Sequence, residues 1–317
     1  MPNGSNDAMY TVAVIGASGL LGRAVVRELG TRAGWRIVPT AHRRVVGNAV
    51  ALDIRDAGAV AAFVDRVRPD AIVVAAAERR PDICEHDPAA ARALNVDAVR
   101  TIASAARRCG AWVLSISTDY VFDGSAPPYR IDDRPAPLNA YGRSKLEGEQ
   151  ALAESTDFGC VLRLPLLFGP VVDWSESAVT SLVPAIVAAS KPDAPPAPMD
   201  AWATRYPTYT ADVAFVIAGM LERHAQGEPI CGIAQWSGAE PMTKFEMAAR
   251  IACALRLDAR LMPQAVSQEA TPRPRDCHLD ASRLEALGIG RRTPFDVALA
   301  EVLAEAVSKK LSGGTTE

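Results

Sequence analysis

A tyrosine and a lysine stand four residues apart in the stretch LNAYGRSKLEGEQ, which covers residues 138–150. Positions i and i+4 share one face of a helix, so Tyr141 and Lys145 would lie on the same side. A phenol with a pKa of about 10 is a weak acid at neutral pH, and a nearby ammonium lowers that pKa by favouring the phenolate. The pair could therefore give a proton to a substrate oxygen. Many helices carry this spacing without such chemistry, so other residues must decide.

A hydroxyl group at Thr118 is the natural third member of this set. The apolar strand in LSISTDYVFDG ends at Ser117, Thr118 and Asp119. Ligands of open parallel sheets bind at the carboxyl ends of the strands. Thr118 is therefore expected beside a bound cofactor, where it would converge with Tyr141 and Lys145.

The elements that would position these groups form a βαβ series. Short β-branched runs alternate with amphipathic stretches between residues 11 and 164, and the expected strands are TVAVIGA, GWRIVPTA, AIVVAAA, AWVLSIS and GCVLRLP. Near-continuous apolar strands separated by helices are typical of a parallel sheet covered on both faces. We therefore predict an α/β fold with a Rossmann-type doubly wound parallel sheet and helices over 20–30, 56–68, 88–109 and 140–154.

The second half of the chain has a different rhythm. Pro-rich loops such as KPDAPPAPMDAW follow residue 164, and helices are expected over 211–224 and 244–255. We predict an NADP-binding domain over 10–165, completed by segments near 208–235. A smaller, discontinuous C-terminal substrate domain would take 166–207 and 236–308. Residues 1–9 and 309–317 are expected to be disordered.

Composition restricts the partners. The 317 residues are 49% hydrophobic, and 34 basic against 37 acidic residues give a net charge of −3. This balance does not suggest nucleic acid or an anionic membrane as a partner. No apolar run is long enough to span a bilayer, and the N-terminus lacks a signal pattern, so we expect a cytoplasmic protein. The six cysteines form no CxxC motif, and we expect reduced thiols and no metal site.

A glycine-rich loop follows the first expected strand. Gly16, Gly19 and Gly22 are spaced as GxxGxxG between a strand and a helix. In such a loop the first glycine permits a tight turn, the second lets the backbone approach a pyrophosphate, and the third allows close helix packing. This context predicts a dinucleotide site, with a ligand-free turn as the alternative. The loop and the first helical turn add Ser18, Leu20 and Leu21 as contacts.

The end of the second strand indicates which dinucleotide binds. An NAD site usually offers a carboxylate there for the ribose 2′-hydroxyl, whereas this chain has His42, Arg43 and Arg44. Guanidinium groups suit a 2′-phosphate, so NADP(H) is predicted over NAD(H), with a solvated basic turn as the alternative. Asp53 and Ile54, after the third strand, would flank the adenine.

Together these motifs resemble the extended short-chain dehydrogenase/reductase family, which combines GxxGxxG with a Ser/Thr, Tyr and Lys set. The resemblance implies that Tyr141 is the proton donor and Thr118 hydrogen-bonds the substrate oxygen. Lys145 would lower the tyrosine pKa and bind the nicotinamide ribose. Asn95, in ALNVDAV, matches a structural or water-relay position. Ala75, Ala76 and Ala77 lie where the family's fourth strand meets the cofactor.

Two branches of the family are similar to this chain. The segments STDYVFDG and PYRIDDRPAPLNAYGRSKLEGE resemble dTDP-4-dehydrorhamnose reductase, although DAWATRYPT and RPRDC depart from that pattern. Other segments, including QWSGAEPMTKFEMA, resemble the NADP-binding regulatory β subunit of methionine adenosyltransferase over nearly the whole chain. The main expectation is an NADPH-dependent reductase of a nucleotide-activated 4-keto sugar in dTDP-L-rhamnose biosynthesis. The alternative is a non-catalytic regulator bound to methionine adenosyltransferase. An epimerase or dehydratase has less support.

The substrate half offers residues for a nucleotide sugar. Arg205, Arg273 and Arg275 suit a diphosphate, and a base could stack on Trp202, Tyr206 or Trp236. The loop after Thr118 adds Asp119, Val121 and Phe122. Alternatively, the arginines are surface residues and the aromatic rings pack the smaller domain. The sequence leaves open the true substrate, catalysis against regulation, a homodimer and the need for a divalent metal.

Overall fold

The computed structural model describes residues 9–267 and 270–312, with side chains up to Glu305. The chain divides into two compact units. Unit 1 comprises the described residues up to 117 together with 144–162 and 214–233, and unit 2 comprises 118–143, 163–213 and the described residues from 234 onwards. Residues 118–143 fall in unit 2, although the sequence suggests a first domain over 10–165. The ligand-binding roles of the two predicted domains stay predictions.

A seven-stranded parallel sheet is built from strands between residues 10 and 164 and from residues 232–235, as predicted. Its spatial order is β3, β2, β1, β4, β5, β6 and β10. The order reverses between β1 and β4, which is the switch point of a Rossmann fold. The strands are β1 Tyr10–Ile15, β2 Trp35–Ala41, β3 Val50–Ala51, β4 Ala71–Val74, β5 Trp112–Thr118, β6 Gly159–Leu164 and β10 Gly232–Gln235.

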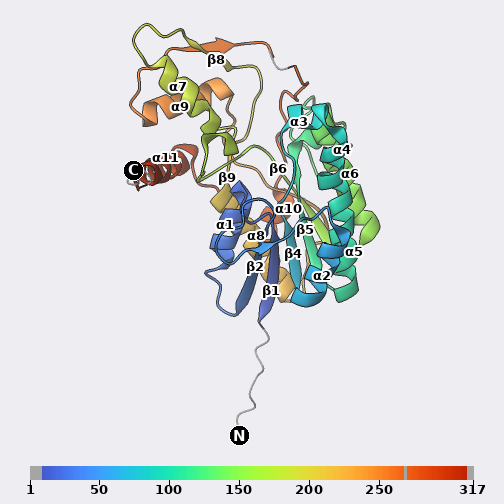
Figure 1. The fold of residues 1–317 in the computed structure, drawn as a ribbon. Coiled ribbons are helices and arrows are strands. Elements are labelled where there is room, and N and C mark those ends of the chain that lie inside the picture. Colours follow the sequence, from blue (N-terminus) through green and yellow to red (C-terminus); the bar gives the residue numbers. More distant parts are fainter. Residues whose placement is uncertain (1–8, 268–269, 313–317) are drawn as a thin grey trace. The chain divides into compact units, whose positions relative to one another are not determined.

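Helices cover both faces of this sheet. Figure 1 shows α1 on the opposite side of β1 and β2 from α2 and α5. The helices are α1 Leu20–Leu29, α2 Ala57–Val67, α3 Pro81–His86, α4 Pro88–Arg92, α5 Ala98–Cys109, α6 Ala140–Ser155 and α8 Thr210–Ala225. The single helix expected over 88–109 is interrupted by a π-helical turn, Ala93–Asp97, in which the Ala98 N–H bonds the carbonyl of Ala93. One extra residue in this turn shifts the register between α4 and α5.

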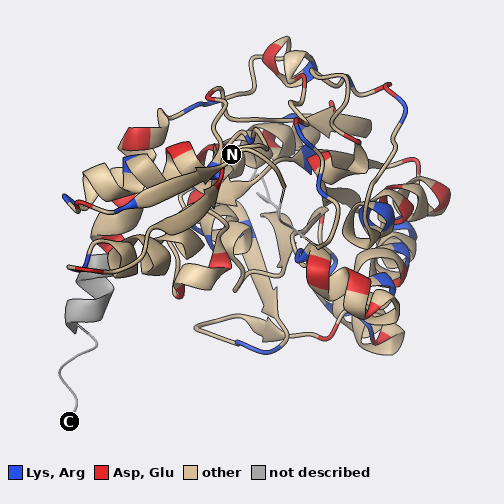
Figure 2. Ribbon diagram, turned by 90° about the horizontal axis from the view of Figure 1, so that it is seen from above, with Lys and Arg blue, Asp and Glu red and all other residues tan. Residues whose placement is uncertain are grey.

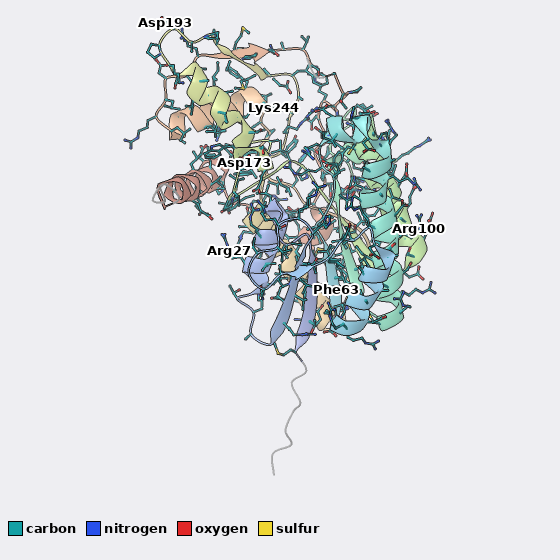
Figure 3. The ribbon with its side chains drawn as sticks, viewed as in Figure 1. Arg27, Phe63, Arg100, Asp173, Asp193 and Lys244 are labelled. Carbon is teal, nitrogen blue, oxygen red and sulfur yellow. The ribbon has the colours of Figure 1, made fainter. Side chains whose placement is uncertain are left out.

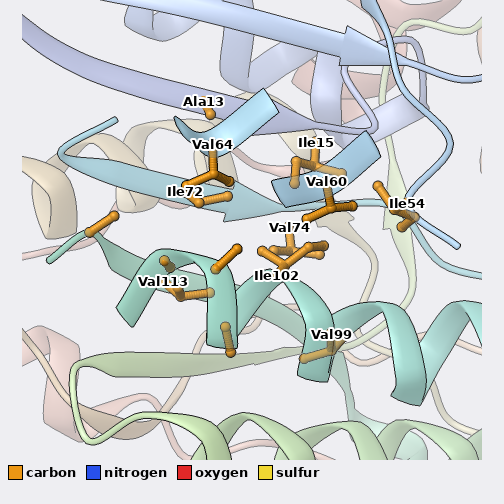
Figure 4. Close-up of a cluster of buried hydrophobic side chains, with 14 of the residues drawn as sticks. Ala13, Ile15, Ile54, Val60, Val64, Ile72, Val74, Val99, Ile102 and Val113 are labelled. Atoms are coloured by element: carbon orange, nitrogen blue, oxygen red, sulfur yellow. The ribbon is translucent and has the colours of Figure 1, made fainter. Parts of the chain in front are cut away.

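A large apolar cluster of unit 1 lies between the sheet and the helices α2 and α5. Apolar side chains of β1 and β4, such as Ile15 and Ile72, pack against Val60 of α2 and Ile102 of α5 (Figure 4). Phe63 of α2, labelled in Figure 3, belongs to the same cluster. Fully burying a side chain of this kind contributes about 1.5–3 kcal/mol, so this layer stabilises the strands that lead into the glycine loop.

Unit 2 contains shorter elements around its own core. Two small parallel sheets pair β7 with β9 and β8 with β11. Its elements are the 3-10 turns η2 Asp119–Val121, η3 Trp174–Glu176 and η4 Thr180–Leu182, the strands β7 Leu167–Phe168, β8 Ala197–Asp200, β9 Thr208–Tyr209 and β11 Leu261–Gln264, and the helices α7 Val183–Ala189, α9 Lys244–Ala254, α10 Ser282–Glu285 and α11 Phe295–Ser312. Apolar side chains of α7, α9 and α11 pack together.

The expected disordered tails are only partly described. Residues 1–8 and 313–317 lie outside the described residues. Helix α11 continues to Ser312, so residues 309–312 are helical. None of the helices in the described residues has the length and apolarity that crossing a bilayer requires.

Charge and thiol groups are distributed without a metal-binding arrangement in the described part of the chain. Lys and Arg alternate with Asp and Glu along the same helices (Figure 2). All six cysteines are free. Within residues 9–267 and 270–312, no three His, Cys, Asp or Glu side chains gather as a metal site.

Candidate functional site

The glycine loop joins the ends of β1 and β4 directly. Gly16 has φ +84°, and a Cβ added there would lie 2.8 Å from the backbone nitrogen of Ala76. The Ala75 N–H bonds the carbonyl of Ile15 at 2.9 Å. Only glycine combines this backbone conformation with so close an approach. The structure therefore brings the predicted loop and the segment of Ala75, Ala76 and Ala77 together.

Gly22 allows helix α1 to begin against the same turn. A Cβ at Gly22 would lie 2.2 Å from the carbonyl oxygen of Gly16, and this distance is too short for any side chain. The Gly19 N–H bonds that same oxygen at 3.0 Å. Leu20 and Leu21 open the helix, and backbone N–H groups of a first turn have no acceptor within the helix. Leu21 has a buried side chain, so it would contact a phosphate only through its backbone.

The basic residues that follow β2 make two different kinds of contact. His42 lies 3.5 Å from Asp53, and Asp53 also forms a salt bridge of 2.6 Å with Arg55. The hydrogen bonds from Arg55 are the main reason that the pKa of Asp53 falls to about 2. Arg43 is exposed, whereas Arg44 donates a hydrogen bond of 2.5 Å to the carbonyl of Ser18. Arg44 thereby reaches the glycine loop itself.

The prediction that Ile54 flanks the adenine is not tested by the structure, but its side chain is directed into the core. Ile54 is buried and packs in the core cluster with Val60, at one end of the group drawn in Figure 4. Its β-branched side chain gains more from this apolar contact than from a place at the surface. Asp53 remains at the surface beside it.

Asn95 lies in the π-helical turn and connects two segments of unit 1 through its side-chain hydrogen bonds. Its amide oxygen accepts from the Glu78 N–H at 2.9 Å, and its amide nitrogen donates to the Glu78 carbonyl and the Ser144 hydroxyl, each at 3.0 Å. The side chain is buried. Asn95 therefore fixes the segment after β4 to helix α6 next to Lys145.

Lys145 is buried in unit 1, and its ammonium group donates a hydrogen bond to the backbone. The Nζ atom donates to the carbonyl of Ile116 at 2.7 Å. Burial lowers the lysine pKa to about 8, while the charges of Glu149 and Cys84 oppose that shift. Glu149 is itself buried and accepts a hydrogen bond of 2.5 Å from Ser117. A group with a pKa this close to neutrality can exchange charge under mild conditions.

Tyr141 lies at the start of α6, the helix that begins in unit 2 and continues in unit 1. Asn139 caps this helix by accepting from the Gly142 N–H at 2.9 Å. A Cβ at Gly142 would lie 2.2 Å from the Tyr120 carbonyl, so glycine permits the close packing there. The rings of Tyr120 and Tyr141 meet edge to face at 5.9 Å. Tyr141 and Lys145 are thus one turn apart on one helix, as the spacing predicts.

Thr118 ends β5 and belongs to unit 2. Its hydroxyl donates to Asp119 at 3.1 Å and accepts from the Tyr120 N–H at 3.2 Å. Asp119 is buried, and burial raises its pKa to about 7 against the opposing charge of Arg205. Thr118 therefore already uses its hydroxyl within the turn that it caps.

Arg205 holds a distant segment rather than facing solvent. It is 5% exposed, and its Nη1 approaches the carbonyl oxygens of Thr204 at 2.8 Å, Pro274 at 3.0 Å and Arg275 at 3.3 Å. Its guanidinium also lies over the Tyr120 ring, 5.7 Å from the centroid. Arg205 is therefore not a surface residue, which was the alternative interpretation, and its Nη1 donates to backbone carbonyls; the expectation that it contacts a diphosphate stays a prediction.

Four other side chains that were expected at a substrate site are buried. Val121 and Phe122 are fully buried, and the Phe122 ring stacks on Tyr129 at 4.1 Å. Tyr206 stacks on His278 at 4.1 Å. Trp236 is buried under the guanidinium of Arg292, 4.1 Å from its ring centroid. These rings pack unit 2, as the alternative interpretation proposed.

A pocket in unit 2 contains the remaining candidates. Its lining is Tyr120, Leu166, Ala178, Asp200, Trp202, Ala203, Arg205, Lys244, Ser267 and Arg273. Trp202, Arg205 and Arg273 were expected at a substrate site and line this pocket, whereas Arg275 is not among the lining residues. Lys244, labelled in Figure 3 at the start of α9, was not expected. Its place directly after the N-cap Thr243, within the capping box that Thr243 forms with Glu246, marks a helix start, but no sequence signal indicates a pocket.

The residues of the glycine loop fit a dinucleotide. At Gly16 and Gly22 an added Cβ would collide with neighbouring backbone atoms, so the loop packs closely there. The N-terminus of α1 and the guanidinium of Arg44 lie next to this loop. A pyrophosphate needs N–H donors and close backbone approach, which such a loop offers. A cofactor with an additional phosphate would also find positive charge beside Ser18.

A family model described as the RmlD substrate binding domain matches residues 10–308. The chain belongs to this family. Its members include extended short-chain dehydrogenase/reductase folds, which agrees with the predicted family.

Curated relatives extend over most of the chain. The β subunit of methionine adenosyltransferase 2 from Xenopus tropicalis is 44% identical over 292 residues, covering 92% of this chain and 86% of the relative. The protein from Danio rerio is 41% identical over 308 residues, covering 95% and 93%. The dTDP-4-dehydrorhamnose reductase of Salmonella typhimurium is 43% identical over 120 residues, covering only 35% of this chain and 40% of that enzyme.

Solved structures share the fold over nearly the full length. The dTDP-4-dehydrorhamnose reductase of Bacillus anthracis, crystallised in complex with NADP, is 26% identical with a TM-score of 0.80, covering 95% of this chain and 100% of that one. The UDP-glucose 4-epimerase of Thermotoga maritima is 17% identical with a TM-score of 0.79, covering 95% and 99%. The second similarity concerns the fold alone.

Proposed function

We propose that this chain is an NADP(H)-binding regulatory protein that associates with a methionine adenosyltransferase. One observation carries the proposal. Identity of 44% to the β subunit continues over 92% of the chain, whereas identity to a reductase of similar degree stops after 35% of it. The shared sequence therefore includes unit 2, where a reductase would bind its sugar nucleotide. This reverses the preference for a reductase that the sequence motifs suggest.

The contacts of two residues support a regulatory role. A reductase of this family needs the Thr118 hydroxyl for a substrate oxygen, but that proton is used in a bond to Asp119. It also needs cationic side chains for a diphosphate, and the Nη1 atom of Arg205 already donates to backbone carbonyls. Releasing either group would require breaking bonds that are already formed, which costs about 1 kcal/mol each or more.

The cofactor would be bound by residues of the glycine loop, the basic turn, helix α6 and the end of β4. Gly16, Gly19 and Gly22 would receive the pyrophosphate, and Arg44 would meet a 2′-phosphate. Lys145 would bind the nicotinamide ribose, and Ala75, Ala76 and Ala77 would line the strand end. NADP(H) supplies hydride chemistry wherever it binds. In a regulator, however, these residues need only bind and order the loop.

Co-purification tests this proposal. The tagged chain, expressed in cells of its own organism, should retain that organism's methionine adenosyltransferase through washing at moderate salt. A tagged dTDP-4-dehydrorhamnose reductase of the same fold is the matched control and should not retain it. Equal recovery of the transferase on both baits would contradict the proposal.

The buried Lys145 favours a second candidate function, a 4-keto sugar reductase. Tyr141 and Lys145 lie one turn apart on α6, and the lysine pKa is lowered to about 8. In a reductase Tyr141 would donate the proton while Lys145 held the ribose. NADPH oxidation at 340 nm with dTDP-4-dehydrorhamnose tests this candidate, and Tyr141→Phe should abolish any rate. Absence of turnover in the parent protein would exclude this activity for that substrate.

A further inference from the structure

The side chain of Asn139 makes hydrogen bonds to two different segments of unit 2. Its Oδ1 atom accepts from the Gly142 N–H at 2.9 Å, which is the capping bond of α6. Its Nδ2 atom donates to the Pro272 carbonyl, also at 2.9 Å, across 133 residues of sequence. The side chain is fully buried. Because Gly142 supplies a donor and Pro272 an acceptor, only one orientation of the amide satisfies both partners.

The Pro272 carbonyl begins a stiff stretch of backbone, residues 272–276, which we call the wall segment. Pro272 and Pro274 fix their own φ angles and restrict the residue that precedes each of them. Arg273 lies between the two prolines, and its side chain lines the pocket of unit 2. A displacement of the Pro272 carbonyl would therefore carry Arg273 with it, because few backbone rotations are available to absorb the movement.

The later part of the wall segment is held by a different part of unit 2. The Pro274 carbonyl accepts from Arg205 at 3.0 Å, and the Arg275 carbonyl accepts from the Thr204 N–H at 2.9 Å. Among these bonds, the one from Asn139 is the bond that joins the wall segment to the turn before α6.

Tyr141 lies two residues after Asn139, in the first turn of α6. Its ring meets the Tyr120 ring edge to face at 5.9 Å, and Tyr120 is another lining residue of the pocket. An N-cap fixes the direction in which a helix leaves the preceding turn, so the two bonds of Asn139 determine where Tyr141 stands. One buried amide thus joins the pocket wall to the first turn of α6.

We propose that Asn139 is a positioning residue for Tyr141, which ties the first turn of α6 to the wall segment of the pocket. A ligand that contacted Arg273 would then act on Tyr141 through the Pro272 carbonyl and the Asn139 amide. Helix α6 also carries Lys145, so the same bond would influence NADP(H) affinity. This last consequence rests on the proposed function, whereas the link between Asn139 and the wall segment does not.

Substitutions of Asn139 separate the cap from the link. The hydroxyl in Asn139→Ser is one bond shorter than the amide, so it caps α6 without spanning to Pro272, whereas Asn139→Ala removes both bonds. The unfolding temperature should follow the cap and fall less in Asn139→Ser than in Asn139→Ala. Hydrogen exchange of the wall segment should follow the link and rise about fivefold in both variants. Asp56→Ser, at the N-cap of α2, is the matched control and should leave this exchange unchanged.

Tyrosine rings labelled with ¹³C report whether Tyr141 follows the wall segment. The chain has six tyrosines, and Tyr141→Phe assigns the signal by NMR. Pro274→Ala frees the backbone of Arg273 and lies outside α6, and it should shift or broaden the Tyr141 signal. Combined with Asn139→Ser, it should leave the signal where Asn139→Ser alone puts it. Pro263→Ala, at an exposed proline of β11, is the matched control and should not move the signal.

The outcomes distinguish the link from the cofactor proposal. Parent-like exchange of the wall segment in Asn139→Ser, or a Tyr141 signal that Pro274→Ala shifts equally with and without Asn139, would overturn the link. In calorimetry, Asn139→Ser should weaken NADP⁺ about threefold or more. If the parent binds no NADP⁺, the cofactor proposal fails, while the exchange and the tyrosine signal still decide the link. If NADP⁺ binds parent and Asn139→Ser equally, the claimed influence on the cofactor is wrong.

Discussion

The Ser117 hydroxyl donates a hydrogen bond of 2.5 Å to the Glu149 carboxylate, and both side chains are buried. Glu149 lies one turn after Lys145 on α6. Its negative charge opposes the effect of burial on the lysine pKa. Tyr141, Lys145 and Glu149 therefore succeed each other at four-residue intervals, and the negative charge of Glu149 favours the charged form of the buried lysine.

Glu149→Gln should lower the pKa of Lys145 further below about 8, by about one unit or more, because the amide keeps the acceptor for Ser117 but removes the charge. The chain has five lysines, so ¹³C labelling of lysine allows the Lys145 titration to be followed by NMR. Glu147→Gln, on the same helix and paired with Arg92 at the surface, is the control. Identical Lys145 titrations in the two variants would show that Glu149 does not sustain the charge.

Asp119 should make stability depend on pH in the neutral range. Its pKa is 3.8 in the unfolded chain and about 7 in the folded protein. Between these values the folded state binds a proton that the unfolded state has lost, so this group's contribution to stability falls as pH rises from about 4 to 7. Asp119→Asn removes that dependence. From pH 5 to pH 8 the variant should gain on the order of 3 kcal/mol relative to the parent in urea unfolding. A difference independent of pH would refute the raised pKa.

Gly22→Ala should destabilise the protein, because its Cβ would collide with the Gly16 carbonyl at 2.2 Å. Displacing backbone in a packed turn costs about 1–3 kcal/mol or more. Gly58→Ala in α2 is the matched control, since its Cβ meets only the Asp56 side chain at 3.3 Å and alanine favours a helix by about 0.5–1 kcal/mol. Thermal unfolding should shift in opposite directions for the two variants. A shift of the same sign and size would contradict the close packing of loop and helix.

Arg205→Lys should loosen unit 2, because an ammonium cannot reach the same set of carbonyls from Thr204, Pro274 and Arg275. Losing hydrogen bonds of a charged group costs about 1.5–3 kcal/mol. Arg275→Lys alters an exposed side chain and should stay within about 0.5 kcal/mol of the parent. Hydrogen exchange of the backbone around residues 273–276 should rise only in Arg205→Lys. Unchanged exchange would mean that other contacts hold this segment.

Sequence reasoning recovers the parts of the molecule that local patterns determine. The parallel sheet, the glycine loop and the Tyr141–Lys145 helix follow from strand periodicity and glycine spacing. The interruption at Ala93–Asp97 does not, because a π-helical turn carries no composition signal. Ile54 shows the same limit, since an apolar residue after a strand can face either the core or a ligand.

The second half was less predictable because its side chains are positioned by contacts between distant segments. Arg205 and the carbonyl of Arg275 are 70 residues apart, and nothing local shows that they meet. Phe122, Tyr206 and Trp236 have the residue types of a ligand site but pack the unit instead. Lys244 enters the pocket lining only through the position of α9. The proposal of a regulator over a reductase likewise rests on how much of the chain is similar to each kind of relative, because the motifs fit both.

Sedimentation velocity of the purified chain mixed with the purified methionine adenosyltransferase of the same organism tests the central claim most directly. The proposed function predicts a faster-sedimenting complex that contains both proteins and saturates at a fixed ratio as this chain is added. The reductase control of the same fold should sediment independently of the transferase. If this chain and the transferase also sediment as separate species at micromolar concentrations, with and without NADP(H), the regulatory account is contradicted.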